Sequence, residues 1–192
     1  MGNSTKLRSP SAICKKPKWP CCQSWKASIG SAWTTRMSKS HMMNEPPALD
    51  IINDTDEEVQ ASVLIRMAEE IFAQERPGLS CFATLYLCND EQMQSFNKQY
   101  RGNPEVTDVL AFRATHGELE PDKGNAKTFL GDIVVDINQA YRQKGTNSFQ
   151  VEIQILVIHG LLHLLGYDHI KTQDKITMEQ KENYYKRKMV GK

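Results

Sequence analysis

The sequence predicts a single α/β (α+β) domain, in which a small mixed β-sheet of about four strands packs with about five helices. Three observations predict it. Segments with strand-like alternation and segments with helical periodicity follow one another from residue 48 to about residue 144. The last third of the chain has helical periodicity alone. With 192 residues, 40% of them hydrophobic, the chain can form one ordinary core but hardly two.

The domain is expected to open with a short strand and a long helix. Residues 48–52 alternate between apolar and polar side chains, which predicts the strand. Asn53, Asp54 and Thr55 are favourable capping residues, so a helix is expected over about residues 56–74. Its buried stripe would contain Val59, Val63, Leu64, Ile65, Met67 and Ile71.

Two further strand-forming stretches and a capped helix follow. Residues 82–87 alternate like a strand, and Asn89 and Asp90 then cap a short helix that runs to about Tyr100. Residues 109–112 predict the next strand.

A hairpin-like connection and three helices complete the domain. The polar loop at 114–126 leads to an apolar strand at 133–135. Asp132, just before that strand, is interpreted as a structural residue that satisfies backbone donors. Helices are then expected at about 138–144, 149–165 and 172–189, the second strongly apolar and the third charged.

Residues 1–46 are expected to be a disordered basic extension ahead of the folded domain at 47–192. They carry eight Lys or Arg, a single acid (Glu45) and no apolar periodicity. One interpretation is an organelle-targeting presequence. The favoured alternative is a mis-assigned start, with initiation near Met42 or Met43 and a cytoplasmic, bacterial-type location.

Charge, cysteine content and hydropathy bear on RNA binding, on the redox state of the thiols and on membrane segments. From residue 47 onward 16 bases face 22 acids, so any RNA contact must come from a local basic cluster rather than from total charge. Cys81 and Cys88 flank a predicted strand and would lie roughly 23 Å apart at about 3.3 Å per residue, so they are expected to be reduced. No run of 18 apolar residues occurs, and neither a membrane span nor a secretory signal is expected.

Three of the five histidines lie within residues 159–169, H-G-L-L-H-L-L-G-Y-D-H. His159 and His163 are four apart on an apolar helix, so they share one face about 6 Å apart. On an unbroken helix His169 would lie roughly 15 Å beyond His159. Gly166 can end the helix in a left-handed conformation and let His169 fold back. The spacing therefore predicts a three-histidine site for one divalent metal.

Three imidazoles and an open fourth position are typical of catalytic zinc, which activates water near neutral pH, so the segment indicates a zinc-dependent hydrolase. Metzincin peptidases share the histidine spacing, but they carry a glutamate general base directly after the first histidine. Gly160 occupies that position here and cannot accept a proton, which disfavours a peptidase.

The same eleven residues resemble the signature H-G-x-L-H-L-x-G-Y-D-H of the YbeY family of rRNA-maturation endoribonucleases. Residues 96–101, F-N-K-Q-Y-R, and 107–112, T-D-V-L-A-F, are similar to that family's L-N-x-x-Y-R and T-D-V-L-S-F segments. Residues 130–133 resemble its L-G-D-I strand. The two departures, Phe96 for Leu and Ala111 for Ser, are conservative in size. The resemblance extends over the whole chain except the N-terminal extension.

This resemblance implies a single-strand-specific, metal-dependent endoribonuclease that acts in rRNA 3′-end maturation and ribosome quality control. Its partner would be ribosomal RNA or the small ribosomal subunit, with a protein partner as a source of specificity. Arg101 matches the family's functional arginine. A guanidinium beside the metal would bind the scissile phosphate through two hydrogen bonds and stabilise its developing charge.

Other residues are weaker candidates. Asp168 would orient a ligand histidine, act as a base through water, or cap a turn. A basic cluster on the last helix would contact RNA, with Tyr184 and Tyr185 available for stacking, or would simply be a solvated helix end; its members are Lys181, Lys186, Arg187 and Lys188. His41 and His116 have no partner at ligand spacing.

Two alternatives to the nuclease stay open. One is a zinc-stabilised ribosome-assembly factor without nuclease activity. The other is a different zinc hydrolase, such as a peptidase with metzincin spacing. Loss of RNA cleavage on substitution of Arg101 would favour the nuclease over the assembly factor.

Overall fold

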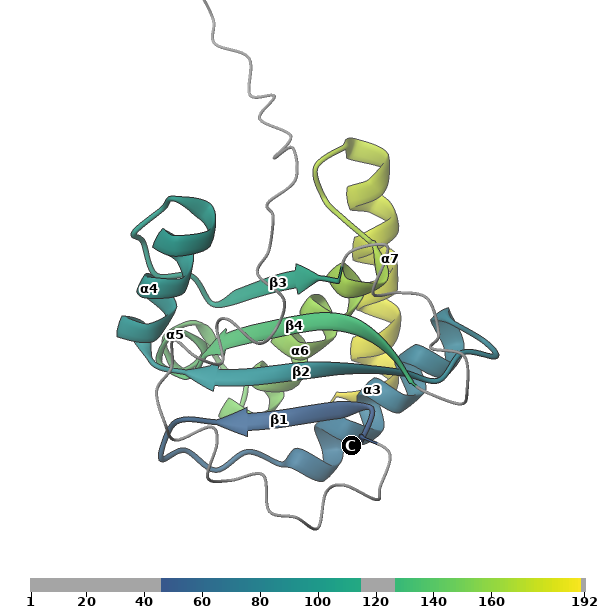
Figure 1. The fold of residues 1–192 in the computed structure, drawn as a ribbon, viewed down its shortest axis with the longest axis horizontal. Coiled ribbons are helices and arrows are strands. Elements are labelled where there is room, and N and C mark those ends of the chain that lie inside the picture. The colour runs from purple at the N-terminus through teal and green to yellow at the C-terminus, as the bar shows by residue number, and fades with distance from the viewer. Residues whose placement is uncertain (1–45, 115–126, 191–192) are drawn as a thin grey trace, which may run out of the picture. The chain divides into compact units, whose positions relative to one another are not determined.

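The fold was obtained as a computed structural model that describes residues 46–114 and 127–190. It confirms the predicted class: the described part contains a four-stranded mixed sheet and five helices (Figure 1). In chain order the elements are β1 (Leu49–Asn53), α3 (Ala61–Glu75), β2 (Cys81–Cys88), α4 (Asp90–Arg101), β3 (Val109–Arg113), β4 (Thr128–Asp136), α5 (Ile137–Gln143), α6 (Phe149–Leu165) and α7 (Thr172–Met189).

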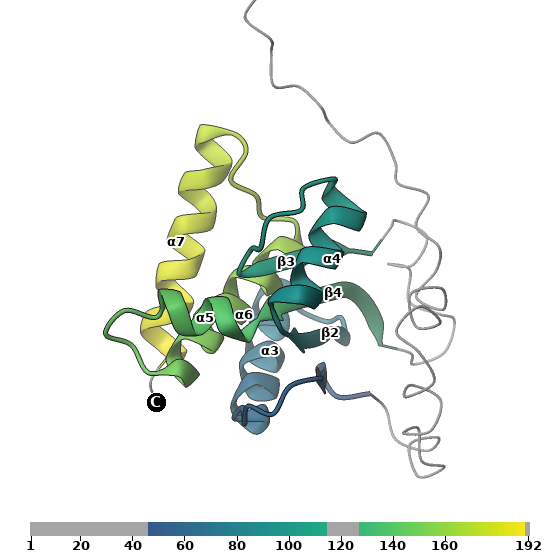
Figure 2. The ribbon, with the colours of Figure 1, turned by 90° about the vertical axis from the view of Figure 1, so that its left-hand side faces the viewer.

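The sheet has the strand order β1-β2-β4-β3. The first three of these strands are parallel, and β3 pairs with β4 in the antiparallel direction, as the predicted hairpin requires. Helices α3 and α6 cover one face of the sheet, and α7 packs against α6 on the same side (Figures 1 and 2). On the other face α4 packs through aromatic contacts, Phe96 against Tyr86 and Tyr100 against Phe112.

The central helix is α6, which packs against β3, β4, α3, α5 and α7. Because it has neighbours on so many sides, its apolar residues do not form a single stripe. Gly160 lies where the helix comes closest to β4. A Cβ atom there would stand 2.7 Å from Cγ2 of Ile133, so the packing of helix on strand excludes any side chain at residue 160.

The first helix begins at Ala61, so the predicted start at residue 56 is wrong. The Asn53 side chain accepts hydrogen bonds from the backbone and hydroxyl of Thr55 and donates to the Glu57 carbonyl, which holds a turn in place of helix. Further on, Gln150 of α6 accepts from the Gln60 amide and donates to the Glu58 carbonyl. These long-range bonds give residues 57–60 an alternative to the helical hydrogen bonds.

Strand β4 is longer than the predicted 133–135, because it starts at Thr128 and includes Gly131 and Asp132. The strand passes through an irregular stretch. Gly131 has a φ angle of +136°, and the register with β2 shifts between Phe82 and Thr84. The α4 cap is confirmed, with Asn89 and Gln92 forming a reciprocal capping box. The bounds of α6 and α7 agree with the predicted ones.

Cys81 and Cys88 lie at opposite ends of β2 and are buried free thiols, as predicted. The structure contains no helix in its described ranges that is long and apolar enough to cross a membrane. The expectations for residues 1–45, for most of the loop at 114–126 and for His41 and His116 lie outside the described residues.

A buried carboxyl group joins the ends of β4, α4 and α5. Asp136 is fully buried, and its Oδ1 caps α5 by accepting from the Asn138 and Gln139 amides. Its Oδ2 has no hydrogen-bond partner within the described chain. Burial, together with the adjacent Asp90 carboxylate, raises the pKa of Asp136 to about 6. Asp90 itself is paired with Arg142, with 3.0 Å between Nη1 and Oδ2.

We expect Asp136→Asn to stabilise the protein at pH 7 by about 1–2 kcal/mol, because asparagine keeps the cap and removes a buried charge. The pKa of Asp136 is raised on folding from 3.8, so its stabilising contribution is present below pH 4 and is lost as the pH rises through 6. The gain of the variant should therefore shrink toward zero by pH 4. Urea unfolding of wild type, Asp136→Asn and the exposed control Asp50→Asn across this range measures it. A gain independent of pH would contradict the explanation.

Candidate metal centre

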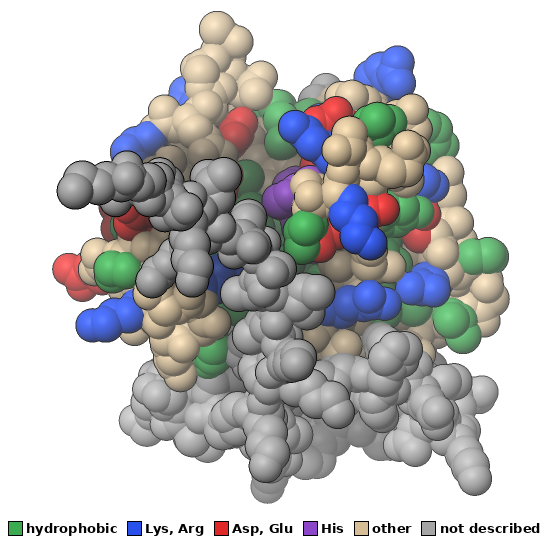
Figure 3. Space-filling model, turned by 90° about the horizontal axis from the view of Figure 1, so that it is seen from above, with side chains coloured by type: hydrophobic (Ala, Val, Ile, Leu, Met, Phe, Trp, Pro, Cys, Tyr) green, Lys and Arg blue, Asp and Glu red, His purple; other side chains and the backbone are tan. Residues whose placement is uncertain are grey.

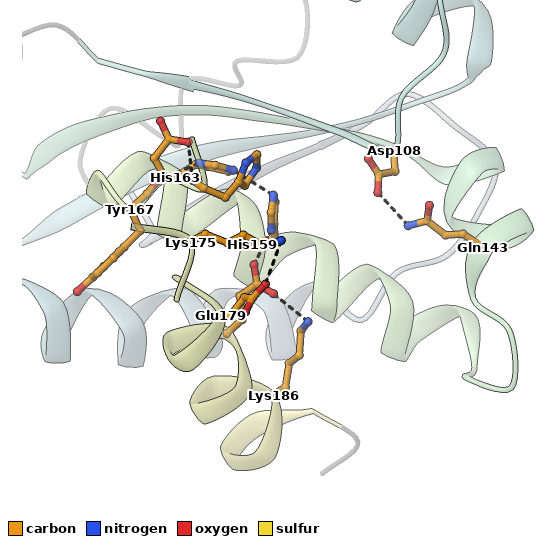
Figure 4. Close-up of polar contacts among 11 residues, drawn as sticks. Asp108, Gln143, His159, His163, Tyr167, Lys175, Glu179 and Lys186 are labelled. Atoms are coloured by element: carbon orange, nitrogen blue, oxygen red, sulfur yellow. Dashed lines mark hydrogen bonds and ion pairs between the residues drawn. The ribbon is translucent and has the colours of Figure 1, made fainter. Parts of the chain in front are cut away.

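The three histidines of residues 159–169 come together in space. His159 and His163 project from the same face of α6, and their Nε2 atoms lie 3.0 Å apart (Figure 4). His169 completes the group, with its ring centroid 5.1 Å from that of His163 and 5.9 Å from that of His159. One ligand atom from each residue lies within 4.8 Å of the other two, which is close enough for all three to bind one ion.

Gly166 ends α6 and turns the chain back toward the helix, as predicted. Its φ is +101°, a left-handed conformation that favours glycine. Its amide donates to the carbonyl of His163, and the amide of Tyr167 donates to the carbonyl of Leu162. His169 thereby returns to the pair from which a continuous helix would have separated it.

The other ring nitrogen of each helical histidine has its own acceptor. Nδ1 of His163 lies 3.0 Å from the Tyr167 carbonyl oxygen, and Nδ1 of His159 lies 2.7 Å from Oε1 of Glu182. A carbonyl and a carboxylate only accept, so each Nδ1 carries a proton. A neutral ring then presents its Nε2 lone pair, and a cation held between the two Nε2 atoms, which lie 3.0 Å apart, would be bound by both rings. The residues present therefore fit a divalent metal.

The electrostatics favour neutral ligands. Burial, followed by the adjacent imidazoles of His159 and His169, lowers the pKa of His163 to about 4, so this ring is neutral at pH 7. Glu182 is ionised: burial alone would raise its pKa, but the hydrogen bond to His159 and the Lys186 ammonium lower it to about 2. Lys186 Nζ stands 3.1 Å from Oε2 of Glu182.

Glu182 is the residue that sequence reasoning missed. It lies on α7, 23 residues beyond His159, and nothing in the local pattern separates it from the other acids of that helix. A carboxylate that accepts from a ligand histidine fixes the ring tautomer and raises the basicity of the metal-binding nitrogen.

We expect Glu182→Gln to lower zinc affinity by about tenfold and Glu182→Ala by about a hundredfold, because glutamine keeps an acceptor for His159 and alanine removes it. Competition with a zinc-binding dye measures both variants. Glu179→Gln is a matched control on the same helix, since that side chain is 58% exposed and pairs with Lys175 instead. Equal affinity of all four proteins would contradict the role given to Glu182.

The loop that carries His169 is anchored to α3. The Tyr167 hydroxyl donates to Glu75 at 2.6 Å, and Glu75 also accepts from Lys181 at 2.8 Å and from the Tyr185 hydroxyl. Arg76, next along the chain, donates to the Leu165 carbonyl at 3.2 Å. The end of α3 therefore holds both the end of α6 and the turn that follows it.

Asp168 lies in this turn. Its carboxylate accepts a hydrogen bond from the amide of the next residue, His169, at 2.6 Å. The contact to a ligand histidine that was considered for Asp168 is made instead by Glu182.

The basic cluster of α7 is largely neutralised by acids. Lys181 pairs with Glu75, Lys186 with Glu182 and Lys188 with Glu70, while Arg187 donates to the Asn183 carbonyl. Tyr185 is wholly buried with its hydroxyl on Glu75, so the expectation that it could stack on a base is wrong. Tyr184 is 40% exposed.

Arg101 is the last residue of α4 and is exposed; within the described chain its side chain makes no hydrogen bond or ion pair. The segment after it is held in place by buried Asn97, which donates to the Glu105 carbonyl at 2.7 Å. Asp108 accepts from the Val109 amide and from Gln143. Seen from above, histidine side chains reach the surface beside a hollow (Figure 3).

The comparisons with known proteins agree on one family over most of the chain. The sequence profile of the family described as Endoribonuclease YbeY matches residues 50–190. A protein named Endoribonuclease YbeY from Desulforamulus reducens is 37% identical over 139 residues, which span 69% of this chain and 91% of that protein. Its namesake from Halalkalibacterium halodurans is 34% identical over 146 residues, 70% of this chain and 91% of that protein. One from Trichormus variabilis is 44% identical over 110 residues, 55% of this chain and 62% of that protein.

Proposed function

The chain belongs to the Endoribonuclease YbeY family, and from this premise we propose that it is a metal-dependent endoribonuclease that cuts single-stranded RNA. The observation that carries the proposal is the approach of the His159 and His163 Nε2 atoms to 3.0 Å, with His169 beside them. All-imidazole ligation with an open position favours zinc. When bound, the metal supplies a hydroxide near neutral pH and polarises a phosphoryl oxygen.

We propose the following roles for the protein's own residues. His159, His163 and His169 hold the metal, and Glu182 and the Tyr167 carbonyl orient the first two rings. Arg101 binds the scissile phosphate with its free guanidinium and stabilises the charge that develops in the transition state. Asp168 holds the turn.

The finer function that we propose is maturation of the 3′ end of ribosomal RNA and ribosome quality control in the cytoplasm. The substrate would be single-stranded rRNA, on or from the small ribosomal subunit. Three of the four residues of the basic cluster on α7 are paired with acids, so we propose that a protein partner supplies part of the specificity.

A peptidase is disfavoured on two grounds. Gly160 offers no general base next to His159. The 2.7 Å approach of its Cβ position to Ile133 also leaves no room for a glutamate. A zinc-stabilised assembly factor without nuclease activity is the alternative that experiment must exclude.

The test combines metal content with cleavage. The purified full-length chain, dialysed against zinc, should contain one metal per chain by mass spectrometry and should cut an end-labelled single-stranded RNA. The same strand annealed to its complement, and casein, should remain intact. Metal without RNA cleavage would move the assignment to the assembly factor, and a chain without metal would overturn the site itself.

A further inference from the structure

A second arginine lies against the metal-binding segment. Arg113 is the last residue of β3, and its guanidinium covers Gly166, the glycine that separates His163 from the turn to His169. The position of a Cβ atom on Gly166 would be 2.9 Å from Nη1, 3.3 Å from Cζ and 3.4 Å from Nη2 of Arg113. Three guanidinium atoms at such similar distances indicate that the group occupies the space that a side chain at residue 166 would need. The absence of a side chain at residue 166 makes this approach possible.

Arg113 has no paired acid among the residues that the structure describes. The residue is exposed, and its side chain makes no hydrogen bond with them either. Other cations near the site are engaged: Lys181 by Glu75, Lys186 by Glu182 and Arg76 by the Leu165 carbonyl. Arg113 therefore keeps its donors available for a ligand.

The chemistry of the Arg113 guanidinium and its place beside the metal-binding segment indicate the ligand that it would bind. A guanidinium offers parallel N–H donors that match two oxygens of a phosphate. The strand proposed to be cut at the histidines carries further phosphates on either side of the scissile one. We propose that Arg113 binds a phosphate of the single-stranded RNA next to the scissile phosphate and so positions the strand across the metal site. This inference rests on the proposed function and adds a substrate-positioning residue to it.

A purely structural role makes a different prediction. A cation near the end of a helix interacts favourably with the helix dipole and its free carbonyls. In that case, removal of the charge would lower the melting temperature and leave RNA binding unchanged. A phosphate-binding role instead changes the salt dependence of binding, because each phosphate contact releases counterions.

The experiment compares zinc-loaded wild type with Arg113→Gln, Arg113→Lys and Arg66→Gln, the last an exposed arginine of α3 that serves as a matched control. Binding of a fluorescein-labelled single-stranded RNA is followed by anisotropy between 50 and 200 mM salt, and the RNA is checked for intactness on a gel. For Arg113→Gln we expect about tenfold weaker binding at low salt and a decrease of about 0.7 in the slope of log K against log salt. Arg113→Lys should keep the slope and lose part of the affinity, and Arg66→Gln should match wild type.

Two results would overturn the inference: a slope for Arg113→Gln equal to that of Arg66→Gln, or a lowered melting temperature with unchanged RNA binding. Cleavage kinetics distinguish this failure from failure of the proposed function. Wild type that binds but never cuts RNA would overturn the nuclease, while the slopes would still decide the role of Arg113. If the nuclease is right, Arg113→Gln should raise KM about tenfold with little change in kcat.

Discussion

His163→Ala is expected to abolish metal binding and to reduce RNA cleavage by at least about a thousandfold, while the chain remains folded. His163 is the middle ligand: its Nε2 lies 3.0 Å from that of His159, and its ring centroid lies 4.6 Å and 5.1 Å from the other two histidine rings. Without it His159 and His169 remain, and two imidazoles on a helix and a turn bind zinc far more weakly than three. Metal content by mass spectrometry, with cleavage measured on the same sample, tests the prediction.

Circular dichroism and a melting curve show whether the His163→Ala protein is folded. Lys175→Ala is a suitable control, because its side chain is 60% exposed on α7 and pairs with Glu179 of the same helix. The control should keep one metal and full activity. One firmly bound metal in His163→Ala would show that the three histidines are not the ligand set.

Arg101→Ala should retain the metal and lose cleavage by about a hundredfold to a thousandfold, the usual effect of removing one donor that stabilises transition-state charge. Arg101 makes no hydrogen bond or ion pair with the described residues, so its removal leaves no buried group without a partner. Single-turnover cleavage at saturating RNA separates the chemical step from binding. Arg101→Lys should recover part of the rate, because lysine restores the charge but not the bidentate geometry.

The assembly-factor alternative predicts the opposite result for Arg101→Ala. Ribosome association would fall and cleavage, if any occurred, would be unaffected. Unchanged cleavage in Arg101→Ala together with loss of metal in His163→Ala would retain the metal site and remove Arg101 from the reaction.

Features set by neighbouring residues were predictable from the sequence. The capping box of α4 needs only Asn89 and Gln92, three residues apart. The return of His169 to the pair needs only a glycine where α6 must end. The family match added Arg101, for which local chemistry alone gave little support.

Features set by distant residues were not predictable. The start of α3 depends on hydrogen bonds to Gln150, about ninety residues away. The pairing of the α7 basic cluster with acids was not evident from the sequence, because its partners Glu70 and Glu75 lie on α3, more than a hundred residues earlier. Glu182 was missed for the same reason, because its role depends on how α7 packs against α6.

The contact between Gly160 and Ile133 has a consequence for evolution and engineering. This site and a metzincin peptidase site differ at one conspicuous position, so a single codon change at residue 160 looks like a short route from one chemistry to the other. The Ile133 side chain, whose Cγ2 atom lies 2.7 Å from the missing Cβ, obstructs that route, since the first step would force the buried Ile133 side chain or α6 to shift. A change of activity would need a smaller residue at 133 beforehand, and that substitution alone would leave a cavity in the core. Each of the two substitutions, at residue 160 or at residue 133, is therefore destabilising when it is made alone. A stepwise change from this site to a peptidase site would pass through a destabilised protein, whichever substitution comes first.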